Sequence, residues 1–194
     1  MGYIAATIIL GMLMLAAGCS RPPSTPEAPS AAEPGEVTAM TFDITSAAFE
    51  DGGTIPSRHT ADGADVSPPL SWQTPPEGTV SLALIVDDPD APRGAWTHWV
   101  LYDLPAGQTS LPEGVPTDNA LPELGGARQG VNDFRDIGYG GPSPPPGPVH
   151  HYRFTLYALD SELGLPPGAS KAEVEKAMQG HVLGQARLVG TYGR

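Results

Sequence analysis

Carboxylate, imidazole and indole side chains are clustered in residues 87–99 of this chain. Asp88 and Asp90 lie within the run Asp-Asp-Pro-Asp-Ala-Pro, and Trp96 and His98 follow closely. An apolar run typical of a β-strand precedes the acidic residues, so we expect the cluster where a strand ends. Imidazole N–H groups can donate hydrogen bonds to an oxyanion, and neighbouring carboxylates orient the rings and favour their charged form.

A second segment brings complementary groups. Gly141 and Pro142 begin a Gly- and Pro-rich loop that leads into a strand starting at His150. Because side chains alternate between the two faces of a strand, His150 and Tyr152 share one face. Trp96 and His98 share a face of their own strand for the same reason.

These two segments predict a small polar pocket if they meet in space. His98, His150 and Tyr152 would donate hydrogen bonds to a phosphate-like group, and Gly141 would let backbone amides come close to it. Asp88 and Asp90 would hold the imidazoles in one orientation. His151 and Arg153 fall on the opposite face of the second strand, where we expect solvent or structural pairing.

Structural roles compete with this interpretation. An Asp beside a Pro commonly just begins a turn, and Trp96 could pack in the core. A His at a strand start is often structural, and the Pro-rich loop could be a rigid connection only. Paired with His98, however, the Asp residues favour a site.

Other chemistries are less well supported by the sequence. Cys19, the single cysteine, lies at the end of an N-terminal apolar segment, so we expect no thiol nucleophile. We find no nucleophile elbow, P-loop, H-E-x-x-H or dinucleotide-binding glycine pattern. Two His and one or two Asp could ligate zinc if they converge, but they lack metal-ligand spacing. We therefore expect no metal, no cofactor and no enzymatic activity.

Composition restricts the class of protein. The chain has 194 residues, enough for one domain of ordinary size, with 24 Gly and 23 Pro placed between apolar runs. The net charge of −12 argues against nucleic acid or an anionic membrane surface as the main partner, because both attract basic faces. Any anion must therefore be held by local donors.

The N-terminal part predicts export and attachment to a membrane. Residues 1–18 contain an apolar core that is short for a membrane span and ends in Ala-Ala-Gly before Cys19, a pattern similar to a lipoprotein signal. Cys19 is then the expected lipidation site. Residues 19–38 are rich in Pro, Ala and Ser and predict a flexible tether. Residues 39–194 form the expected domain.

Within that domain, β-like runs separated by Pro, Gly and Asp loops predict strands over 79–86, 97–104, 150–159 and 186–192. Ser170 and Glu173 form a capping box, which predicts a helix that ends at Gly180. Residues 181–185 are ambiguous. Long strands with few helices favour two packed antiparallel sheets.

The chain from about residue 40 to 194 resembles the phosphatidylethanolamine-binding protein family, in its bacterial branch of Raf-kinase-inhibitor-like proteins. Nine blocks carry the resemblance in order, among them Val-Ser-Pro-Pro-Leu-Ser-Trp, Asp-Asp-Pro-Asp-Ala-Pro, Gly-Tyr-Gly-Gly-Pro and His-His-Tyr. They occupy residues 55–58, 62–63, 66–72, 82–92, 99–102, 132–134, 138–142, 150–152 and 189–194.

The resemblance implies a mainly β fold, a Greek-key antiparallel β-sandwich with a short C-terminal helix. It also implies an anion pocket that accepts phosphate or a phospholipid head group. Carried over residue by residue, that pocket consists of Asp88, Trp96, His98, Gly141, Pro142, His150 and Tyr152, and Asp90 belongs to the same motif.

The leading functional hypothesis is a membrane-tethered binding protein outside the cytoplasm that takes a small phosphorylated or anionic ligand. Relatives that block kinases or proteases imply an alternative, a protein-binding inhibitor of a protease. A further alternative is a hydrolase of small phosphate esters, with Asp88 as base and His98 as acid. The sequence leaves a homodimer open.

Overall fold

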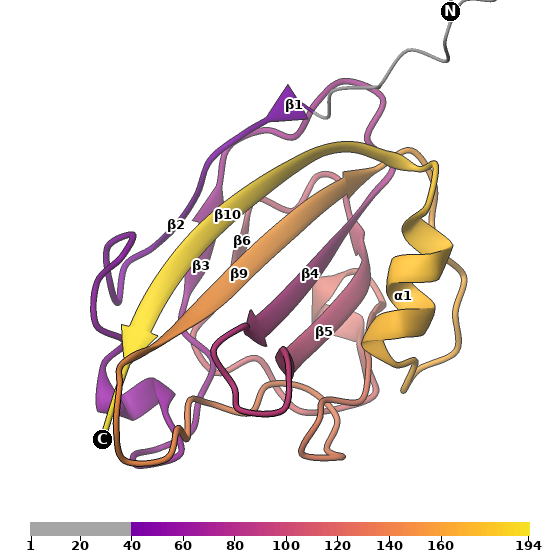
Figure 1. The fold of residues 1–194 in the computed structure, drawn as a ribbon. Coiled ribbons are helices and arrows are strands. Elements are labelled where there is room, and N and C mark those ends of the chain that lie inside the picture. The colour runs from indigo at the N-terminus through magenta and orange to yellow at the C-terminus, as the bar shows by residue number, and fades with distance from the viewer. Residues whose placement is uncertain (1–39) are drawn as a thin grey trace, which may run out of the picture. The chain divides into compact units, whose positions relative to one another are not determined.

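The computed structural model describes residues 40–194, which fold mainly into β-strands (Figure 1). The predicted signal segment 1–18, Cys19 and the predicted tether 19–38 lie outside the described residues. The strands are β1 (Met40–Thr41), β2 (Ile44–Ser46), β3 (Leu70–Trp72), β4 (Ser81–Asp88), β5 (Trp96–Pro105), β6 (Ser110–Leu111), β7 (Ala120–Leu121), β8 (Ala127–Gln129), β9 (His150–Leu159) and β10 (Val182–Tyr192). One α-helix, α1 (Lys171–Met178), and two 3-10 turns, Ser57–His59 and Pro122–Leu124, complete the described elements.

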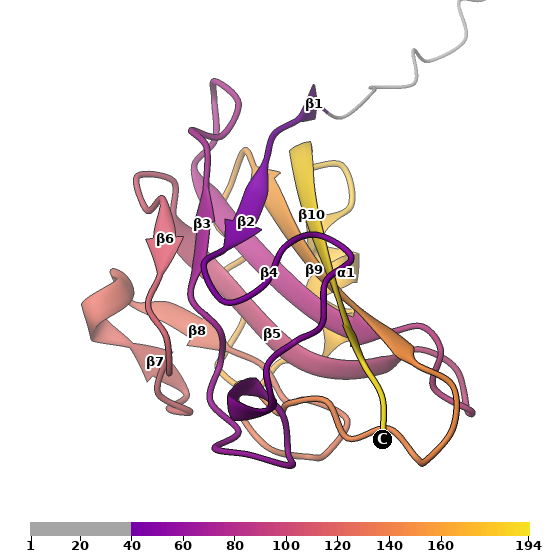
Figure 2. The same cartoon turned by 90° about the vertical axis from the view of Figure 1, so that its left-hand side faces the viewer.

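The strands form two sheets that pack face to face. The larger sheet has the order β1-β10-β9-β4-β5-β8-β7, and the smaller one has the order β2-β3-β6. All pairs are antiparallel except β1 with β10. Figure 2 shows the smaller sheet in front of the larger one. The predicted pair of antiparallel sheets is therefore confirmed.

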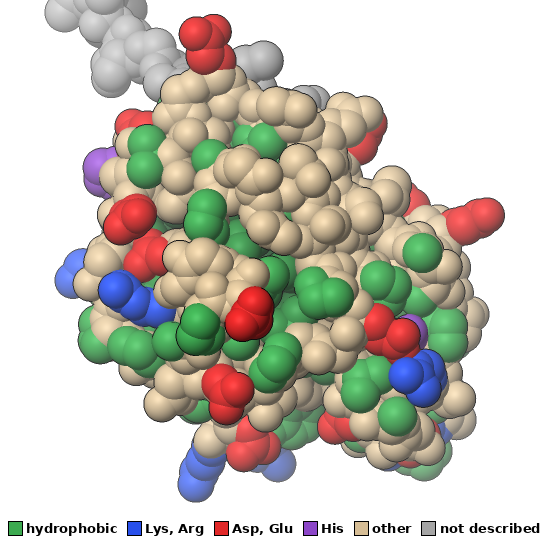
Figure 3. Space-filling view, turned by 180° about the vertical axis from the view of Figure 1, so that it is seen from behind, with side chains coloured by type: hydrophobic (Ala, Val, Ile, Leu, Met, Phe, Trp, Pro, Cys, Tyr) green, Lys and Arg blue, Asp and Glu red, His purple; other side chains and the backbone are tan. Residues whose placement is uncertain are grey.

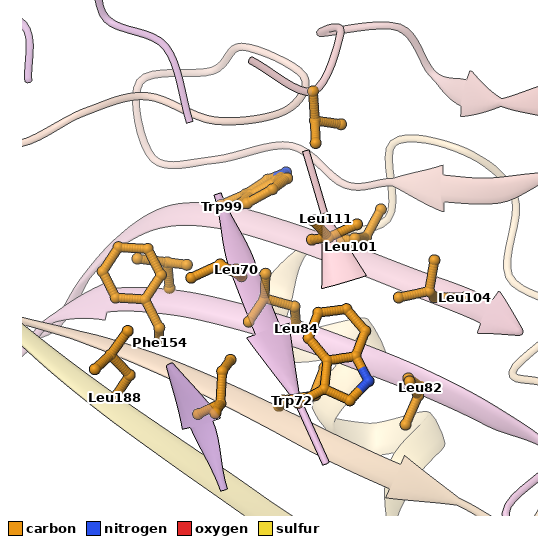
Figure 4. Packing of buried hydrophobic residues seen from close by; sticks show 14 of the residues in the cluster. Leu70, Trp72, Leu82, Leu84, Trp99, Leu101, Leu104, Leu111, Phe154 and Leu188 are labelled. Carbon is orange, nitrogen blue, oxygen red and sulfur yellow. The ribbon is translucent and has the colours of Figure 1, made fainter. Parts of the chain in front are cut away.

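The core fills the space between the sheets. Leu70 and Trp72 of β3 face Leu84 of β4, with Trp99 and Phe154 of the neighbouring strands beside them, all buried (Figure 4). The opposite face of the larger sheet is covered by a second apolar cluster, which includes Ile85 of β4 and Val174 and Met178 of α1. Since both faces are covered, every residue of β4 is buried, which explains its continuous apolar run.

The C-terminal helix begins where its cap predicts. The Ser170 side chain accepts from the Glu173 backbone N–H, and the Glu173 carboxylate accepts from the Ser170 N–H, so the capping box is present. After α1 the chain turns at Gly180, whose φ of 82° suits glycine. β10 begins at Val182, so the ambiguous residues 181–185 belong mostly to the last strand.

The surface agrees with the acidic composition. On the face drawn in Figure 3, acidic side chains are scattered around apolar ones and basic side chains are few. Among residues 40–194, no helix is long and apolar enough to cross a membrane.

Candidate functional site

A pocket opens where the ends of three neighbouring strands meet. β4 runs antiparallel to both β5 and β9, so the end of β4 lies beside the beginnings of the other two. Asp88 at the end of β4 therefore pairs with Trp96 at the start of β5, and His150 begins β9 nearby. The pocket has a volume of about 460 Å³ and is lined by Asp88, Ala91, Pro92, Arg93, Trp96, His98, Phe134, Ser143, Pro144, Pro145, His150 and Tyr152.

Five of the predicted site residues are brought together here. Asp88, Trp96, His98, His150 and Tyr152 all line the pocket. The alternation expected along β9 holds, because His150 and Tyr152 are buried whereas His151 is exposed.

A buried carboxylate orients one of the two imidazoles. His150 Nδ1 lies 2.7 Å from Asp88 Oδ2, and the two side chains are only 8% and 5% exposed. A carboxylate accepts, so His150 donates through Nδ1–H, and Nε2 is the ring nitrogen left for a ligand. The other oxygen of Asp88 accepts from the Asp90 backbone N–H at 2.8 Å, which fixes the carboxylate in turn.

The second imidazole is held by the backbone. His98 Nδ1 lies 2.6 Å from the Gly140 carbonyl oxygen, while the Gly140 N–H donates to the His98 carbonyl at 2.9 Å. Burial lowers the pKa of His98 and outweighs the opposing effects of the Gly140 bond and of Asp88. The acidic neighbours favour the charged form of His98, as expected, but burial has the larger effect, and the net shift favours the neutral ring.

Two polar atoms at the pocket are buried without a partner among residues 40–194. They are the indole Nε1 of Trp96 and the hydroxyl of Tyr152. Burial raises the pKa of Tyr152, with a further contribution from Asp88, so its hydroxyl stays protonated. Leaving such groups unpaired costs about 1–3 kcal/mol each. A ligand oxygen that accepted a hydrogen bond from either group would relieve its share of that cost.

Asp90 does not serve the pocket as predicted. Its Oδ2 accepts from both the backbone N–H and the Nδ1 of His151, at 2.8 and 2.7 Å, on the exposed side of β9. The pairing lowers the pKa of Asp90. The reason is the turn after β4, which sends Asp88 inward to His150 and leaves Asp90 outside.

Gly141 and Pro142 are also absent from the pocket lining. The Gly141 N–H donates to Asp65 Oδ1 at 2.7 Å, and the Pro142 carbonyl accepts from Ala61 N–H at 3.0 Å. A Cβ on Gly141 would lie 2.5 Å from that Asp65 oxygen and 2.7 Å from the His59 carbonyl oxygen. The expectation of a Gly141 amide aimed at a ligand is therefore wrong. The glycine instead lets two loops of the protein approach each other.

The far face of β9 has the structural pairing that was predicted. Arg153 makes two hydrogen bonds to Asp87, at 2.8 and 3.0 Å, and Lys171 of α1 reaches the same carboxylate at 2.5 Å. Burial alone would raise the pKa of Asp87, but the two cations together hold it below its ordinary value. This network fastens α1 to the sheet behind the pocket.

Several lining residues were missed by sequence reasoning. Arg93 brings a cation to the pocket, and Phe134 packs edge-on against Trp96 and His98, with ring centroids 5.4 and 5.3 Å away. Ser143, Pro144 and Pro145 come from the Pro-rich loop. Arg93 lies beside the acidic motif, and Phe134 lies within a block of the family resemblance. The sequence therefore contained a signal that could have identified both residues as pocket residues. No group of three or more His, Cys, Asp or Glu within residues 40–194 is arranged to hold a metal ion.

Comparisons with known proteins give the relatives of this chain. It is 40% identical to the "Putative lipoprotein LppC" of Mycobacterium tuberculosis, over 96% of this chain and 94% of that protein. It is 56% identical to a "UPF0098 protein" of Methanothermobacter thermautotrophicus, over 76% of this chain and 95% of that one.

Solved structures show the same fold. The crystal structure of Escherichia coli YbcL, described as a new member of the mammalian PEBP family, has a TM-score of 0.74 and 34% identity, covering 79% of this chain and 98% of that one. A PEBP homologue from Chlamydia trachomatis has a TM-score of 0.71 and 38% identity, with the same coverage. The family model for "Phosphatidylethanolamine-binding protein" matches residues 45–193, and the chain belongs to this family.

Proposed function

We propose that this protein binds a small phosphate-like oxyanion in the pocket between the ends of β4, β5 and β9. One observation carries the proposal: Trp96 Nε1 and the Tyr152 hydroxyl are buried at the pocket without a partner among residues 40–194. Both groups can donate a hydrogen bond, and the oxygens of an oxyanion mainly accept hydrogen bonds. The hydrogen bond from His150 to Asp88 fixes the imidazole of His150 as a third polar group in the same pocket.

Binding of inorganic phosphate, measured by isothermal titration calorimetry, tests this proposal. We expect one site per chain in the wild type and a large loss in Trp96→Phe, which keeps the aromatic contact with Phe134 but removes the N–H donor. Absence of binding to the wild type at millimolar phosphate would overturn the proposal.

We further propose that the domain works outside the cytoplasm on a lipid-anchored tether. The supporting observations are the Ala-Ala-Gly-Cys pattern ending at Cys19 and the similarity to a protein named as a lipoprotein. That similarity covers 96% of the chain, so it reaches into the segment before residue 40. Two or more acyl chains would give stable attachment.

The Asp88–His150 pair favours hydrolysis of small phosphate esters as a second candidate. With Nδ1–H held by Asp88, Nε2 of His150 could take a proton from water while the water oxygen bonds to phosphorus. The ester P–O bond then breaks, and His150 returns the proton to the leaving alcohol. His150 replaces Asp88 as the base, because both Asp88 oxygens already accept hydrogen bonds. Turnover of p-nitrophenyl phosphate that is lost in His150→Ala would support this candidate.

A further inference from the structure

The hydrogen-bonding directions at His98 restrict what a ligand can present there. The Gly140 carbonyl only accepts, so the Nδ1 of His98 must carry the hydrogen of their 2.6 Å bond. Nε2 makes no hydrogen bond to any of residues 40–194, and the ring lines the pocket. In the neutral ring, Nε2 therefore offers a lone pair to the ligand.

The surroundings of His98 favour the neutral form of its ring. Burial lowers its pKa, although the Gly140 bond and the carboxylates of Asp88, Asp133 and Asp65 act in the opposite direction. The edges and faces of Phe134 and Tyr152 surround the ring, at centroid distances of 5.3 and 5.1 Å. The other titratable groups that line the pocket are His150 and Arg93.

The pocket thus combines two kinds of polar group. Trp96 N–H and Tyr152 O–H are unpaired among the described residues and can donate, whereas neutral His98 accepts. A phosphodiester anion has no hydrogen to donate. Its oxygen lone pairs would therefore face the lone pair of His98 Nε2, and the two would repel each other. A phosphate monoester has a second pKa of about 6 and so readily carries one P–OH group.

We propose that the pocket selects a phosphate monoester, bound with one P–OH group that donates to His98 Nε2, over phosphodiesters. The inference rests on the proposed anion binding and names its ligand class. The monoprotonated form also carries one negative charge fewer than the dianion, which lowers repulsion from Asp88 at the pocket wall. The net charge of −12 acts in the same direction.

Calorimetric titration of the full chain with three soluble probes tests the selectivity. We expect glycerol 3-phosphate to bind about 5- to 150-fold more tightly than dimethyl phosphate or glycerophosphoethanolamine, because these two ligands leave a buried acceptor without a partner. Equal affinity for dimethyl phosphate would overturn the inference. So would equal affinity for glycerophosphoethanolamine, because its ammonium group would then be the donor. If no phosphate compound binds, the proposed anion binding itself fails.

Proton uptake gives a second readout. Above pH 7 the free monoester is mainly the dianion, so binding with a P–OH group must take up nearly one proton. Titrations at pH 7.5 in buffers of different ionisation enthalpy measure that number, and we expect it to fall toward zero at pH 5. No uptake at pH 7.5 would overturn the inference.

A His98→Gln variant separates this role from folding. The Gln amide is neutral at every pH in this range and can donate to an oxyanion, so we expect the preference for the monoester and the proton uptake both to shrink strongly. His181→Gln is the matched control, because His181 is exposed and pairs with Asp160 outside the pocket. Unchanged selectivity in a folded His98→Gln variant would overturn the assigned contact.

A phosphate monoester group can belong to a soluble metabolite or to a lipid. Short-chain dihexanoyl phosphatidic acid is a monoester, and dihexanoyl phosphatidylglycerol is a diester with the same acyl chains. Tight binding of the first but not of glycerol 3-phosphate would identify a lipid ligand, and comparable binding of both would identify a soluble one. Preference for the phosphatidylglycerol would overturn the inference.

Discussion

The substitution Tyr152→Phe separates ligand binding from stability, because the Tyr152 hydroxyl has no partner among residues 40–194. The residue is 1% exposed, and its ring packs edge-on against His98 with centroids 5.1 Å apart, a contact that Phe keeps. Removing an unpaired buried hydroxyl takes away a cost of about 1–3 kcal/mol. We therefore expect the free energy of unfolding to stay the same or to rise by about 1 kcal/mol.

Phosphate binding should change in the opposite direction. A hydrogen bond from Tyr152 to a charged oxygen contributes about 1.5–3 kcal/mol. At about 1.4 kcal/mol for each factor of ten, its loss raises the dissociation constant about 10- to 150-fold. Such a combination of weaker binding and unchanged or higher stability is characteristic of a group held ready for a ligand.

Two measurements decide the outcome: calorimetry with inorganic phosphate at pH 6.5 and urea denaturation without phosphate. Tyr157→Phe is the matched control, since Tyr157 lies on the opposite face of β9 and should leave phosphate affinity unchanged. If Tyr152→Phe binds phosphate within twofold of the wild type, the hydroxyl is not a ligand donor. A loss of stability well above 1 kcal/mol would instead mean that the hydroxyl serves the fold.

Three other variants test neighbouring parts of the reasoning. His150→Ala should weaken phosphate binding at least about tenfold, whereas His151→Ala, on the exposed face with Asp90, should bind almost normally; equal losses would refute the face assignment. Asp87→Asn should lower the free energy of unfolding at pH 7 by about 2–3 kcal/mol, less than a fully buried pair would give, because its two cationic partners are partly solvated. Since the pKa of Asp87 is lowered by folding, its stabilisation is complete above about pH 5 and is lost as the pH falls through its native pKa, so the variant and the wild type should converge in acid denaturation curves. Cys19→Ala should move the protein from the membrane fraction to the soluble fraction, and unchanged membrane association would point to a different anchor.

Strand periodicity was sufficient to predict much of the site. Alternation assigned His150 and Tyr152 to the buried face of β9 and His151 to the exposed one, as the structure shows. Antiparallel pairing then brings Asp88 and Trp96 together, since the end of one strand meets the start of the next. The face of each side chain follows from backbone geometry that any strand shares, so residue spacing predicts it, whereas the pairing of the strands is seen only in the fold.

The turn after β4 was beyond that kind of reasoning. Asp88 and Asp90 are two residues apart, and strand alternation would place them on one face. Asp90 lies past the end of β4, however, where hydrogen bonding of its backbone N–H to Asp88 controls the chain direction. The two carboxylates therefore pair with different histidines, His150 and His151. Local hydrogen bonds, and not side-chain period, decide which imidazole each carboxylate meets.

Gly141 illustrates a different limit. A glycine in a rigid loop predicts a close approach of the backbone to something, and the sequence does not say whether that is a ligand or another part of the chain. Here it is Asp65, which accepts the Gly141 N–H at 2.7 Å. Residues 65 and 141 are far apart in sequence, so only the folded topology reveals the contact.

The hydrogen bonds of the acidic groups explain how so acidic a protein could offer the proposed anion site. Both oxygens of Asp88 already accept, from His150 and from the Asp90 N–H, while Asp65 is engaged by Gly141. Carboxylates satisfied in this way orient the protein's own groups and leave the donors of the pocket free for a ligand. Two of the remaining donors, on Trp96 and Tyr152, are neutral and buried, where a hydrogen bond is stronger than in water, and Arg93 adds a cation to the lining. The proposed anion binding would therefore depend on these donors, on the imidazole of His150 and on the proton that the anion shares with His98, and the net charge of −12 does not exclude it.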